Sequence, residues 1–588
     1  MKASRKKIVL TAINAKYIHS NLAVYSLRKY AEEYAENIEL AEYTINQNTD
    51  DILRDLYKKK PDVLAISCYI WNISMVFSII KELKKVLPSV EIWLGGPEVS
   101  YDTEKLLQEN PCVDGVMVGE GEATFLACMA YWVDGNSALE EIDGLVFKKE
   151  GQVVRTKPRL PMDLSKIPFP YDNLDDFTHK IVYYETSRGC PFCCSYCLSS
   201  IERGVRLRDL NLVKKELQFF LDRKVPQVKF IDRTFNCNHE HAMGIWTYIL
   251  EHDNGVTNFH FEVSADLLRE EELELLGRMR VGLVQLEIGV QSTNARTIQA
   301  IHRTMNLEKL SYAVERVRQG RNIHQHLDLI AGLPYEDYES FNQSFNQVYA
   351  WKPDQLQLGF LKVLKGSGMY LEQDAHGILY KGEPPYEVMA TRWLSYDEVL
   401  VLKNVEEMVE VYYNSGQFTH TLQFLLHFYT DAFSFYKELG DYYERQGLQG
   451  LQHARIARYD ILLAYVEESR QELVAPLKEL LVYDLYLREN MKSRPAFGAD
   501  QAPWKDRYYG FYKEMEFANR QGDENPMSAY TGYQARQMAR MTHIETFTFD
   551  LKKLCETGTI AHRAHHILFD YKKRHPLTQD AKTLEITI

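Results

Sequence analysis

Long hydrophobic runs are missing from this sequence. It contains no run of about 18 apolar residues, the length that a helix needs to cross a bilayer. The first residues, MKASRKKIVLTAIN, begin with basic side chains, but the apolar part that follows is short and predicts a strand rather than a signal peptide. We therefore expect a cytoplasmic protein that has no membrane partner.

Positive charge and cysteine are also scarce. The formal net charge of -13 argues against broad electrostatic binding to nucleic acid. The 588 residues include only nine cysteines, and in a cytoplasmic chain clustered thiols indicate metal binding rather than disulfides. Five of them stand alone and are expected to be small buried residues: Cys68, Cys112, Cys128, Cys237 and Cys555. The sequence shows no internal repeat and no low-complexity tract.

The first part of the chain alternates short apolar stretches with stretches of helical spacing. The apolar stretches, which predict five strands, are residues 7–14, 38–45, 62–70, 91–97 and 113–120. Strands separated by helices predict an α/β fold with a doubly wound, Rossmann-like parallel sheet. Such sheets bind ligands beyond the carboxyl ends of their strands, at the point where the strand order reverses.

Several residues at these strand ends are candidate ligand contacts. Paired glycines let a ligand approach the backbone, and aromatic rings offer flat apolar surface. The alternative for Gly-Gly-Pro at 95–97 is a simple turn into the next helix. The candidates are Asn14, His19, Tyr69, Trp71, Asn72, Gly95, Gly96, Gly119 and Glu120.

A proline-rich segment, residues 153–177, predicts an extended linker. Beyond it, six more apolar stretches alternate with longer helical stretches and predict a partial (β/α)6 barrel, near residues 182–187, 227–231, 259–263, 283–288, 326–330 and 355–360. From about residue 385 the spacing is helical, apart from a strand at 543–551. The predicted organisation is a first domain at 1–140, a linker at 141–178, a barrel at 179–380 and a mostly α domain at 385–588.

Four cysteines are crowded into GCPFCCSYC, residues 189–197. Two abutting C-x-x-C pairs would suggest structural zinc, but the side chains of the adjacent Cys193 and Cys194 tend to diverge, which strains a site with four ligands. Cys190, Cys194 and Cys197 instead form C-x-x-x-C-x-x-C, three thiolates for an iron–sulfur cluster with one iron left open. Cys193 is then a bystander.

This motif, with Tyr196 before its last cysteine and a predicted strand before its first, resembles the radical S-adenosylmethionine (SAM) superfamily. Later segments resemble the family in order: VKFIDRTFN, HFEVSADLL, LEIGVQSTN, HLDLIAGLPYED and LKVLKGSGM. In the first of these Asp232 matches, but Arg233 stands where a second carboxylate is common. The resemblance implies a [4Fe-4S] cluster that binds SAM at its open iron. It suggests SAM contacts at Tyr196, Glu262, Glu287 and Gln291.

The first domain, joined to such a barrel through Ile-Pro-Phe-Pro, is similar to the cobalamin-binding class of that superfamily over roughly residues 1–375. The resemblance implies cobalamin between the two domains. One departure concerns the cobalt ligand, because the D-x-H-x-x-G motif of histidine-ligating domains is replaced by NAKYIHSN. His19 is therefore a candidate axial ligand or a hydrogen-bonding histidine, and the loop Tyr69 to Asn72 is the alternative neighbour of the cobalt.

The class implies a methylating enzyme. In it, one SAM methylates cobalamin, a second yields a 5'-deoxyadenosyl radical, and the substrate radical takes the methyl group at an unactivated carbon. An external electron donor of the flavodoxin or ferredoxin type is implied, and the substrate, a small molecule, RNA or peptide, is open. Alternatives are cobalamin-dependent ring formation or redox rearrangement, a non-catalytic cobalamin or SAM sensor, and a tRNA methylthiotransferase whose second cluster would use Cys68, Cys112 and Cys128.

The last third, residues 385–588, resembles a helical extension of unassigned function found on some proteins of this class, and we expect it to cap the barrel. Its stretch 495–521 interleaves basic and aromatic residues, which favours an amphipathic surface with a buried aromatic side over a nucleic-acid surface. His562, His565 and His566 have helical spacing without an evident metal partner.

Overall fold

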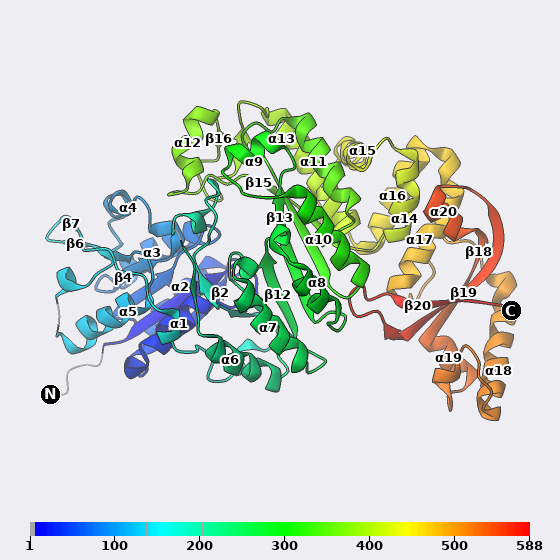
Figure 1. The fold of residues 1–588 in the computed structure, drawn as a ribbon, viewed down its shortest axis with the longest axis horizontal. Helices are drawn as coiled ribbons and strands as arrows, with labels where there is room; N and C mark the ends of the chain where they lie inside the picture. Colours follow the sequence, from blue (N-terminus) through cyan, green and yellow to red (C-terminus); the bar gives the residue numbers. More distant parts are fainter. Residues whose placement is uncertain (1–5, 137, 203) are drawn as a thin grey trace. The chain divides into compact units, whose positions relative to one another are not determined.

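The computed structural model describes residues 6–136, 138–202 and 204–588. Its chain separates into two compact units. The first comprises residues 1–323, 332–337 and 360–395, and the second comprises 324–331, 338–359 and 396–588. Figure 1 traces the elements of both units in chain order.

The first unit begins with a seven-stranded sheet in the order β2-β1-β3-β4-β5-β6-β7. Its strands are β1 (Ile8–Asn14), β2 (Ile38–Thr44), β3 (Val63–Ser67), β4 (Glu91–Gly95), β5 (Gly115–Met117), β6 (Leu145–Lys149) and β7 (Gln152–Arg155). The first five pair in parallel, which confirms the predicted doubly wound fold. The hairpin β6–β7 pairs antiparallel at the edge and lies inside the range predicted as linker.

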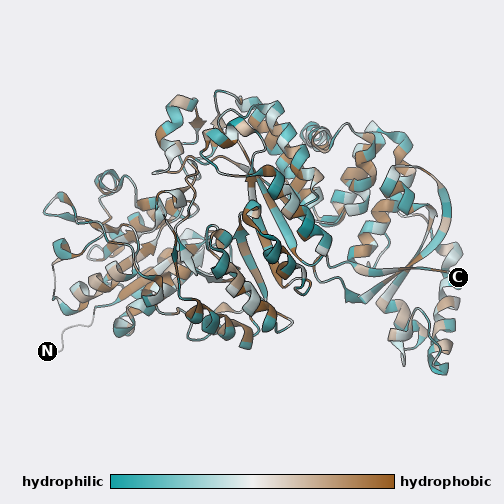
Figure 2. Ribbon diagram, in the orientation of Figure 1, coloured by the Kyte–Doolittle hydropathy of each residue, from teal (hydrophilic) through white to brown (hydrophobic). Residues whose placement is uncertain are grey.

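Helices cover both faces of this sheet. One core contains residues of α2 (Thr49–Lys59), α3 (Ile73–Val86) and α4 (Thr103–Glu109), and the other contains residues of α1 (Leu22–Tyr30) and α5 (Glu122–Met129). All residues of β1 and β3 are buried, as in a parallel sheet enclosed on both sides. Figure 2 shows the same pattern as hydrophobic strands beneath helices with hydrophilic outer faces.

The strand order places the binding edge of the sheet. Chain order runs from β1 to β2 on one side and to β3 on the other, so the crossovers diverge between β1 and β3. The crevice for a ligand is expected beyond the carboxyl ends of these two strands. Asn14 ends β1, and Tyr69 follows β3 by two residues.

The second sheet has the order β15-β14-β13-β12-β11-β8, an open arrangement whose edges are β8 and β15. In the first unit, β8 (Val182–Tyr184), β11 (Gln227–Phe230), β12 (Asn258–Val263) and β13 (Val284–Gln291) pair in parallel. Five helices alternate with them or follow β13: α6 (Leu210–Asp222), α7 (His239–Glu251), α8 (Glu270–Gly277), α9 (Ala295–Ala300) and α10 (Leu307–Gly320). This alternation confirms the predicted partial (β/α)6 barrel.

Short elements complete the first unit. The two-residue strands β9 (Ser187–Arg188) and β10 (Arg206–Leu207) form an antiparallel ribbon around the cysteine segment. After the barrel strands come α12 (Gly368–His376), β16 (Leu379–Tyr380) and β17 (Val388–Ala390).

The second unit contains β14 (His324–Ala331), β15 (Gln355–Phe360), α11 (Tyr338–Ala350) and the C-terminal region. The region's helices are α13 (Tyr396–Met408), α14 (Thr419–Leu425), α15 (Ala432–Arg445), α16 (Arg455–Ser469), α17 (Val474–Arg488), α18 (Lys505–Gln521), α19 (Ala535–Met541) and α20 (Leu551–Thr557). The strand predicted at 543–551 is β18 (Thr542–Phe549).

Two further strands, β19 (His562–Arg574) and β20 (Ala581–Ile586), were not predicted. They pair with β18 in the antiparallel order β18-β19-β20. The helical interpretation of His562, His565 and His566 is therefore wrong, because these residues lie on the central strand. The helical spacing of these histidines is local, whereas β19 is held as a strand by pairing with β18 and β20. Such pairing depends on tertiary contacts and cannot be recognised from one stretch of sequence.

Among the described residues, no helix is both long and apolar enough to cross a membrane.

Candidate functional site

The cysteine segment lies in the loop that follows β9, beyond the carboxyl end of β8. Cys194 is buried, Cys190 and Cys197 are half-buried, and Cys193 is exposed. Since Cys193 and Cys194 differ in this way, their side chains point in different directions. The exposure of Cys193 sets it apart from the other three cysteines, and the assignment of Cys190, Cys194 and Cys197 as the cluster ligands stays a prediction.

The backbone of this loop is fixed by two other segments of the first unit. The amide of Ser195 donates to the carbonyl of Ile301 over 3.0 Å, and its carbonyl accepts from the amide of Met369 over 2.7 Å. At the loop's start, Gly189 has φ +91°, and a Cβ there would lie 2.1 Å from the carbonyl oxygen of Gly204. The loop is therefore positioned by close backbone contacts before any metal binds.

Arg303 contacts the loop from its inner side, a role that sequence reasoning missed. Its Nη1 donates to the hydroxyl of Tyr196 over 3.2 Å and to the Sγ of Cys194 over 3.8 Å, and its Nη2 donates to the carbonyl of Gly289. Burial raises the pKa of the Cys194 thiol, and the guanidinium opposes that rise. Arg303 thus connects the cysteine loop to β13 and supplies positive charge beside the sulfur of Cys194.

The end of β13 is shaped around Gln291. Gln291 has φ +70°, and a Cβ on Gly289 would lie 2.3 Å from its Nε2 atom. Its Oε1 atom is buried without a hydrogen-bond partner, as are Ser195 Oγ and Arg303 Nε. Buried polar atoms without partners are rare in proteins and indicate that another group satisfies them. These atoms fit a polar ligand such as SAM beside the cysteine loop.

Two predicted carboxylates stand side by side on neighbouring strands. Glu262 on β12 is in register with Glu287 on β13. Glu287 accepts from Lys229 over 3.0 Å and is 2.9 Å from His260 Nε2. Burial would raise its pKa, but these two partners bring it down to about 2. Glu262 has a looser neighbour, since the Nη1 atom of Arg233 lies 4.0 Å from its Oε2.

Asp232, at the end of β11, anchors the start of the cysteine loop. It is 1% exposed and accepts from the hydroxyls of Thr186 and Ser187, each over 2.6 Å, and from the Thr186 amide over 3.1 Å. Burial raises its pKa to about 6, although the three hydrogen bonds oppose the rise. Asp232 therefore fixes the backbone at Thr186 and Ser187, just before the cysteine segment.

Because the pKa of Asp232 is higher in the folded protein, its stabilising effect is complete at acid pH and is lost as pH rises through about 6. We expect the contribution of this group to the free energy of unfolding to fall by about 2 kcal/mol between pH 4 and pH 7.5. Urea unfolding of the apoprotein across this range measures it. In Asp232→Asn that part of the pH slope should vanish, and an unchanged slope would refute the assignment.

At the switch point of the first sheet, the predicted aromatic residues form a stacked pair. The rings of Tyr69 and Trp71 are 4.3 Å apart and nearly parallel, and Trp71 remains 42% exposed. Asn72 holds their loop: its Nδ2 donates to the carbonyls of Ile13 and Ser67, and its Oδ1 accepts from the Tyr69 amide. The fully buried Asn72 shapes the loop, while the aromatic pair forms its accessible surface.

His19 and Asn14 connect β1 to the barrel. The Nδ1 of His19 is 2.6 Å from the hydroxyl of Tyr183 on β8, and its backbone forms a β-bridge with Ile181. Burial and the nearby Lys16 and Lys229 lower the His19 pKa. Asn14 donates to the carbonyl of His19 over 3.1 Å. His19 therefore forms a hydrogen bond through its Nδ1 atom. Its lowered pKa favours the neutral imidazole.

Of the predicted glycines and Glu120, only Gly119 has open space beside its backbone, and the others contact other parts of the chain. Gly119 has φ +85° and open space where a Cβ would be, whereas a Cβ on Gly96 would lie 2.5 Å from the carbonyl oxygen of Cys68. Gly96, with φ +110°, is therefore required by the chain's own packing, and Gly95 is in ordinary contact with Met117. The carboxylate of Glu120 binds the Met162 amide and Arg206, so it pins the segment before the barrel.

This contrast predicts different costs for two matched substitutions. Gly96→Ala combines backbone strain with a main-chain clash and should destabilise the sheet edge by at least about 3 kcal/mol. Gly119→Ala carries only the strain, about 1 kcal/mol. Amide hydrogen exchange of residues 64–99 measures the local loss of stability. Equal effects of the two substitutions would contradict this account of Gly96.

The scattered cysteines of the methylthiotransferase alternative do not meet. Cys68 belongs to the core that contains α2 and α3, and Cys128 belongs to the core on the opposite face of the sheet. Burial raises the pKa of both thiols. Side chains on opposite faces of a sheet cannot bind one metal cluster, which removes the residue basis of that alternative.

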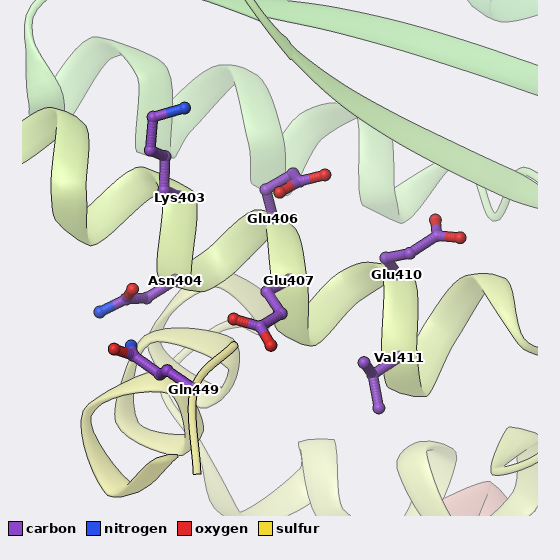
Figure 3. A pocket seen from close by; sticks show the side chains of 7 residues that line it. All are labelled: Lys403, Asn404, Glu406, Glu407, Glu410, Val411 and Gln449. Carbon is purple, nitrogen blue, oxygen red and sulfur yellow. The ribbon is translucent and has the colours of Figure 1, made fainter. Parts of the chain in front are cut away.

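A pocket on the C-terminal region holds none of the predicted site residues. It runs along α13 and its continuation, where Figure 3 shows Asn404, Glu407 and Val411 on the side that faces Gln449. Its other lining residues are Lys403, Glu406 and Glu410. A solvated acidic helix face accounts for this composition without a ligand.

Three family models match consecutive parts of the chain: "B12 binding domain" at residues 8–129, "Radical SAM superfamily" at 184–348, and "Protein of unknown function (DUF4080)" at 374–569. The chain is similar to an uncharacterized methyltransferase of Pyrococcus horikoshii, with 26% identity over 60% of this chain and 77% of the relative. It is also similar to the cobalamin-dependent radical SAM methyltransferase TokK of Streptomyces tokunonensis, with 27% identity over 49% of this chain. The chain spans only 45% of the length of TokK.

Two solved structures share the fold. The cobalamin-dependent SAM radical enzyme OxsB matches with a TM-score of 0.57 and 14% identity over 82% of this chain and 83% of that chain. The radical SAM methyltransferase TsrM of Kitasatospora setae, with cobalamin and a [4Fe-4S] cluster bound, matches with a TM-score of 0.52 and 17% identity over 65% of this chain and 78% of that chain. At this level of identity the likeness concerns the fold.

Proposed function

Since the chain belongs to the cobalamin-binding radical SAM enzymes, we propose that it methylates an unactivated carbon of its substrate. The observation that supports the proposal is the contact, within the first unit, between the segments predicted to hold the two cofactors. His19, from the loop after β1, is 2.6 Å from Tyr183 of β8. Arg188, two residues before Cys190, binds Glu122 of α5 over 2.5 Å. The cysteine loop and the switch point of the first sheet are thereby joined.

Three residues are proposed to hold the [4Fe-4S] cluster: Cys190, Cys194 and Cys197. The exposed Cys193 remains outside the ligand set. Arg303 holds Tyr196 and Cys194 in place and balances the negative charge of the thiolates. When bound, the cluster supplies the electron that cleaves SAM, and cobalamin carries the methyl group to be transferred.

SAM is proposed to lie at the carboxyl ends of β12 and β13. The unpartnered Gln291 Oε1 accepts from its amino or hydroxyl groups, and Glu262 offers a second acceptor. The carboxylate of Glu287 holds Lys229 and His260 in place next to this position. Glu287 is therefore proposed to act on the SAM site indirectly, through these two side chains. Tyr196, held by Arg303, closes the side next to the cysteines.

Cobalamin is proposed to lie against the Tyr69–Trp71 pair, with the open backbone at Gly119 giving it room to approach the chain. His19 is proposed to make a polar contact through Tyr183, and its neutral form leaves the Nε2 atom able to act as a ligand. The aromatic surface also excludes water from the reaction site. The reductant is proposed to be an external flavodoxin- or ferredoxin-type protein, and the enzyme is proposed to act in the reducing cytoplasm.

Spectra and products test the function. The protein, purified anaerobically and reconstituted with iron, sulfide and hydroxocobalamin, should retain both chromophores. With SAM, reductant and substrate it should yield S-adenosylhomocysteine and 5'-deoxyadenosine together. 5'-Deoxyadenosine alone would support rearrangement or ring formation instead. Two clusters without cobalamin, or zinc without iron, would overturn the proposal.

A further inference from the structure

A buried carboxyl group, which the proposed chemistry does not use, lies behind the predicted cobalamin loop. Glu98, in the turn after β4, is 8% exposed. Its Oε1 accepts from the hydroxyl of Tyr386 over 2.5 Å, and the Nζ of Lys365 lies 3.8 Å away. Burial raises the pKa of Glu98, while Tyr386 and Lys365 oppose the rise. A buried polar pair between segments 288 residues apart constrains where both segments lie.

On one side, Glu98 is attached to the loop with the aromatic pair. Its amide donates to the carbonyl of Cys68 over 3.4 Å. Gly96 approaches the same carbonyl so closely that a Cβ would lie 2.5 Å from its oxygen. Cys68 directly precedes Tyr69, so a displacement of Glu98 is transmitted to the stacked rings through main-chain contacts.

On the other side, Tyr386 is attached to the segment that follows β15. Its carbonyl accepts from the Val363 amide over 3.0 Å, and the Val388 amide donates to the Leu361 carbonyl over 2.8 Å. The loop then continues through Lys365 to Gly366, where a Cβ would lie 2.3 Å from the ring of Tyr101. This loop is thus packed against Glu98, in the turn after β4, and against Tyr101, which directly follows that turn.

The same loop ends on the cysteine segment. The amide of Met369 donates to the carbonyl of Ser195 over 2.7 Å, and a Cβ on Gly368 would lie 3.2 Å from the Ser195 side chain. Ser195 directly follows Cys194. Residues 365–369, which we name the bridging loop, therefore contact the turn after β4 at one end and the proposed cluster loop at the other.

We propose that Glu98 and Tyr386 are positioning residues that fix the cobalamin-side loop against the bridging loop, and thereby set the placement of cobalamin relative to the cluster. The proposal rests on the proposed function for the identity of the two cofactors. Neither residue touches the reacting atoms. Their hydrogen bond preorganises the cobalamin-side loop, so its loss is expected to weaken binding through the entropy of ordering that loop.

Tyr386→Phe removes the hydroxyl and leaves the ring in place. The variant, reconstituted with its cluster, should bind hydroxocobalamin about tenfold more weakly than the wild type, with unchanged iron content. Glu98→Met should have the same effect, and the double variant should again show about tenfold rather than a hundredfold. Tyr43→Phe is the matched control, because Tyr43 donates to Asp55 over 2.6 Å in the same sheet without contacting the bridging loop.

Amide hydrogen exchange separates positioning from general destabilisation. In the wild type, added hydroxocobalamin should slow exchange in residues 365–369 and 194–196, and in Tyr386→Phe this response should be lost while far-UV circular dichroism stays unchanged. Normal cobalamin binding in Tyr386→Phe, additive losses in the double variant, or an equal loss in Tyr43→Phe would overturn the proposal. A wild type that binds cobalamin without protecting these residues would overturn this proposal alone. A wild type that binds none would overturn the proposed function as well.

Discussion

Cys194→Ala should yield a protein that holds no [4Fe-4S] cluster, whereas Cys193→Ala should hold as much iron and sulfide as the wild type. Cys194 is buried beside Arg303 and Tyr196, and Cys193 is exposed on the adjacent position. A cluster bound by three thiolates loses a corner ligand in the first variant and no ligand in the second. The difference is expected to be complete rather than graded.

Iron and acid-labile sulfide per chain, measured after anaerobic reconstitution and gel filtration, provide the test. The two variants differ by one position and remove the same atom, so each controls for loss of a thiol from the loop. Cys190→Ala and Cys197→Ala should resemble Cys194→Ala. Retained cluster in Cys194→Ala together with loss in Cys193→Ala would reverse the ligand assignment.

Arg303→Met should have the second-largest effect. The substitution leaves the carbonyl of Gly289, the hydroxyl of Tyr196 and the sulfur of Cys194 without their common donor. Removing a charged partner from buried groups costs about 3 kcal/mol, so the loop should release its cluster far more readily. Any retained cluster should have a midpoint potential lower by on the order of 100 mV, because adding an electron is harder without the neighbouring positive charge.

Redox titration followed by electron paramagnetic resonance measures the potential, and dilution into chelator measures the release of iron. Arg303→Lys restores the charge without the two-sided hydrogen bonding, so it should recover most of the potential and only part of the cluster retention. Arg318→Met, at an exposed arginine that pairs with Glu315 on α10, is the control for loss of a surface charge. A wild-type potential in Arg303→Met would contradict the electrostatic role.

Much of the site was predictable because its signals are local. The spacing of Cys190, Cys194 and Cys197 lets three side chains of one loop reach a single metal cluster, so the sequence alone could predict this site. The strand ends at Asn14 and Ser67 follow from apolar runs, and parallel pairing places such ends on one edge. The six barrel strands were found for the same reason, since strand and helix periods alternate visibly along the chain.

The residues that were missed act through distant partners. Arg303 contacts a cysteine 109 positions away, and Tyr386 contacts Glu98 across 288 positions. Neither lies in a motif, so their sequence neighbourhoods carry no signal. The predicted contacts Asn72 and Glu120 lie where expected, but their side chains are engaged by the chain's own backbone and by Arg206. The domain boundaries remain predictions, although β6 and β7 show that the first sheet extends to Arg155.

Neighbouring residues were enough to predict the α/β alternation, the three-cysteine motif and the strand ends where ligand contacts can lie. Each of these features depends on residues within one or two turns or strands of one another. The folded chain was needed to show which glycine is required for packing, which cysteine is exposed and which arginine contacts the cysteine loop. It also decided that His562, His565 and His566 lie on a strand. These outcomes depend on backbone approaches and buried hydrogen bonds between remote segments, and such contacts exist only once the chain has folded.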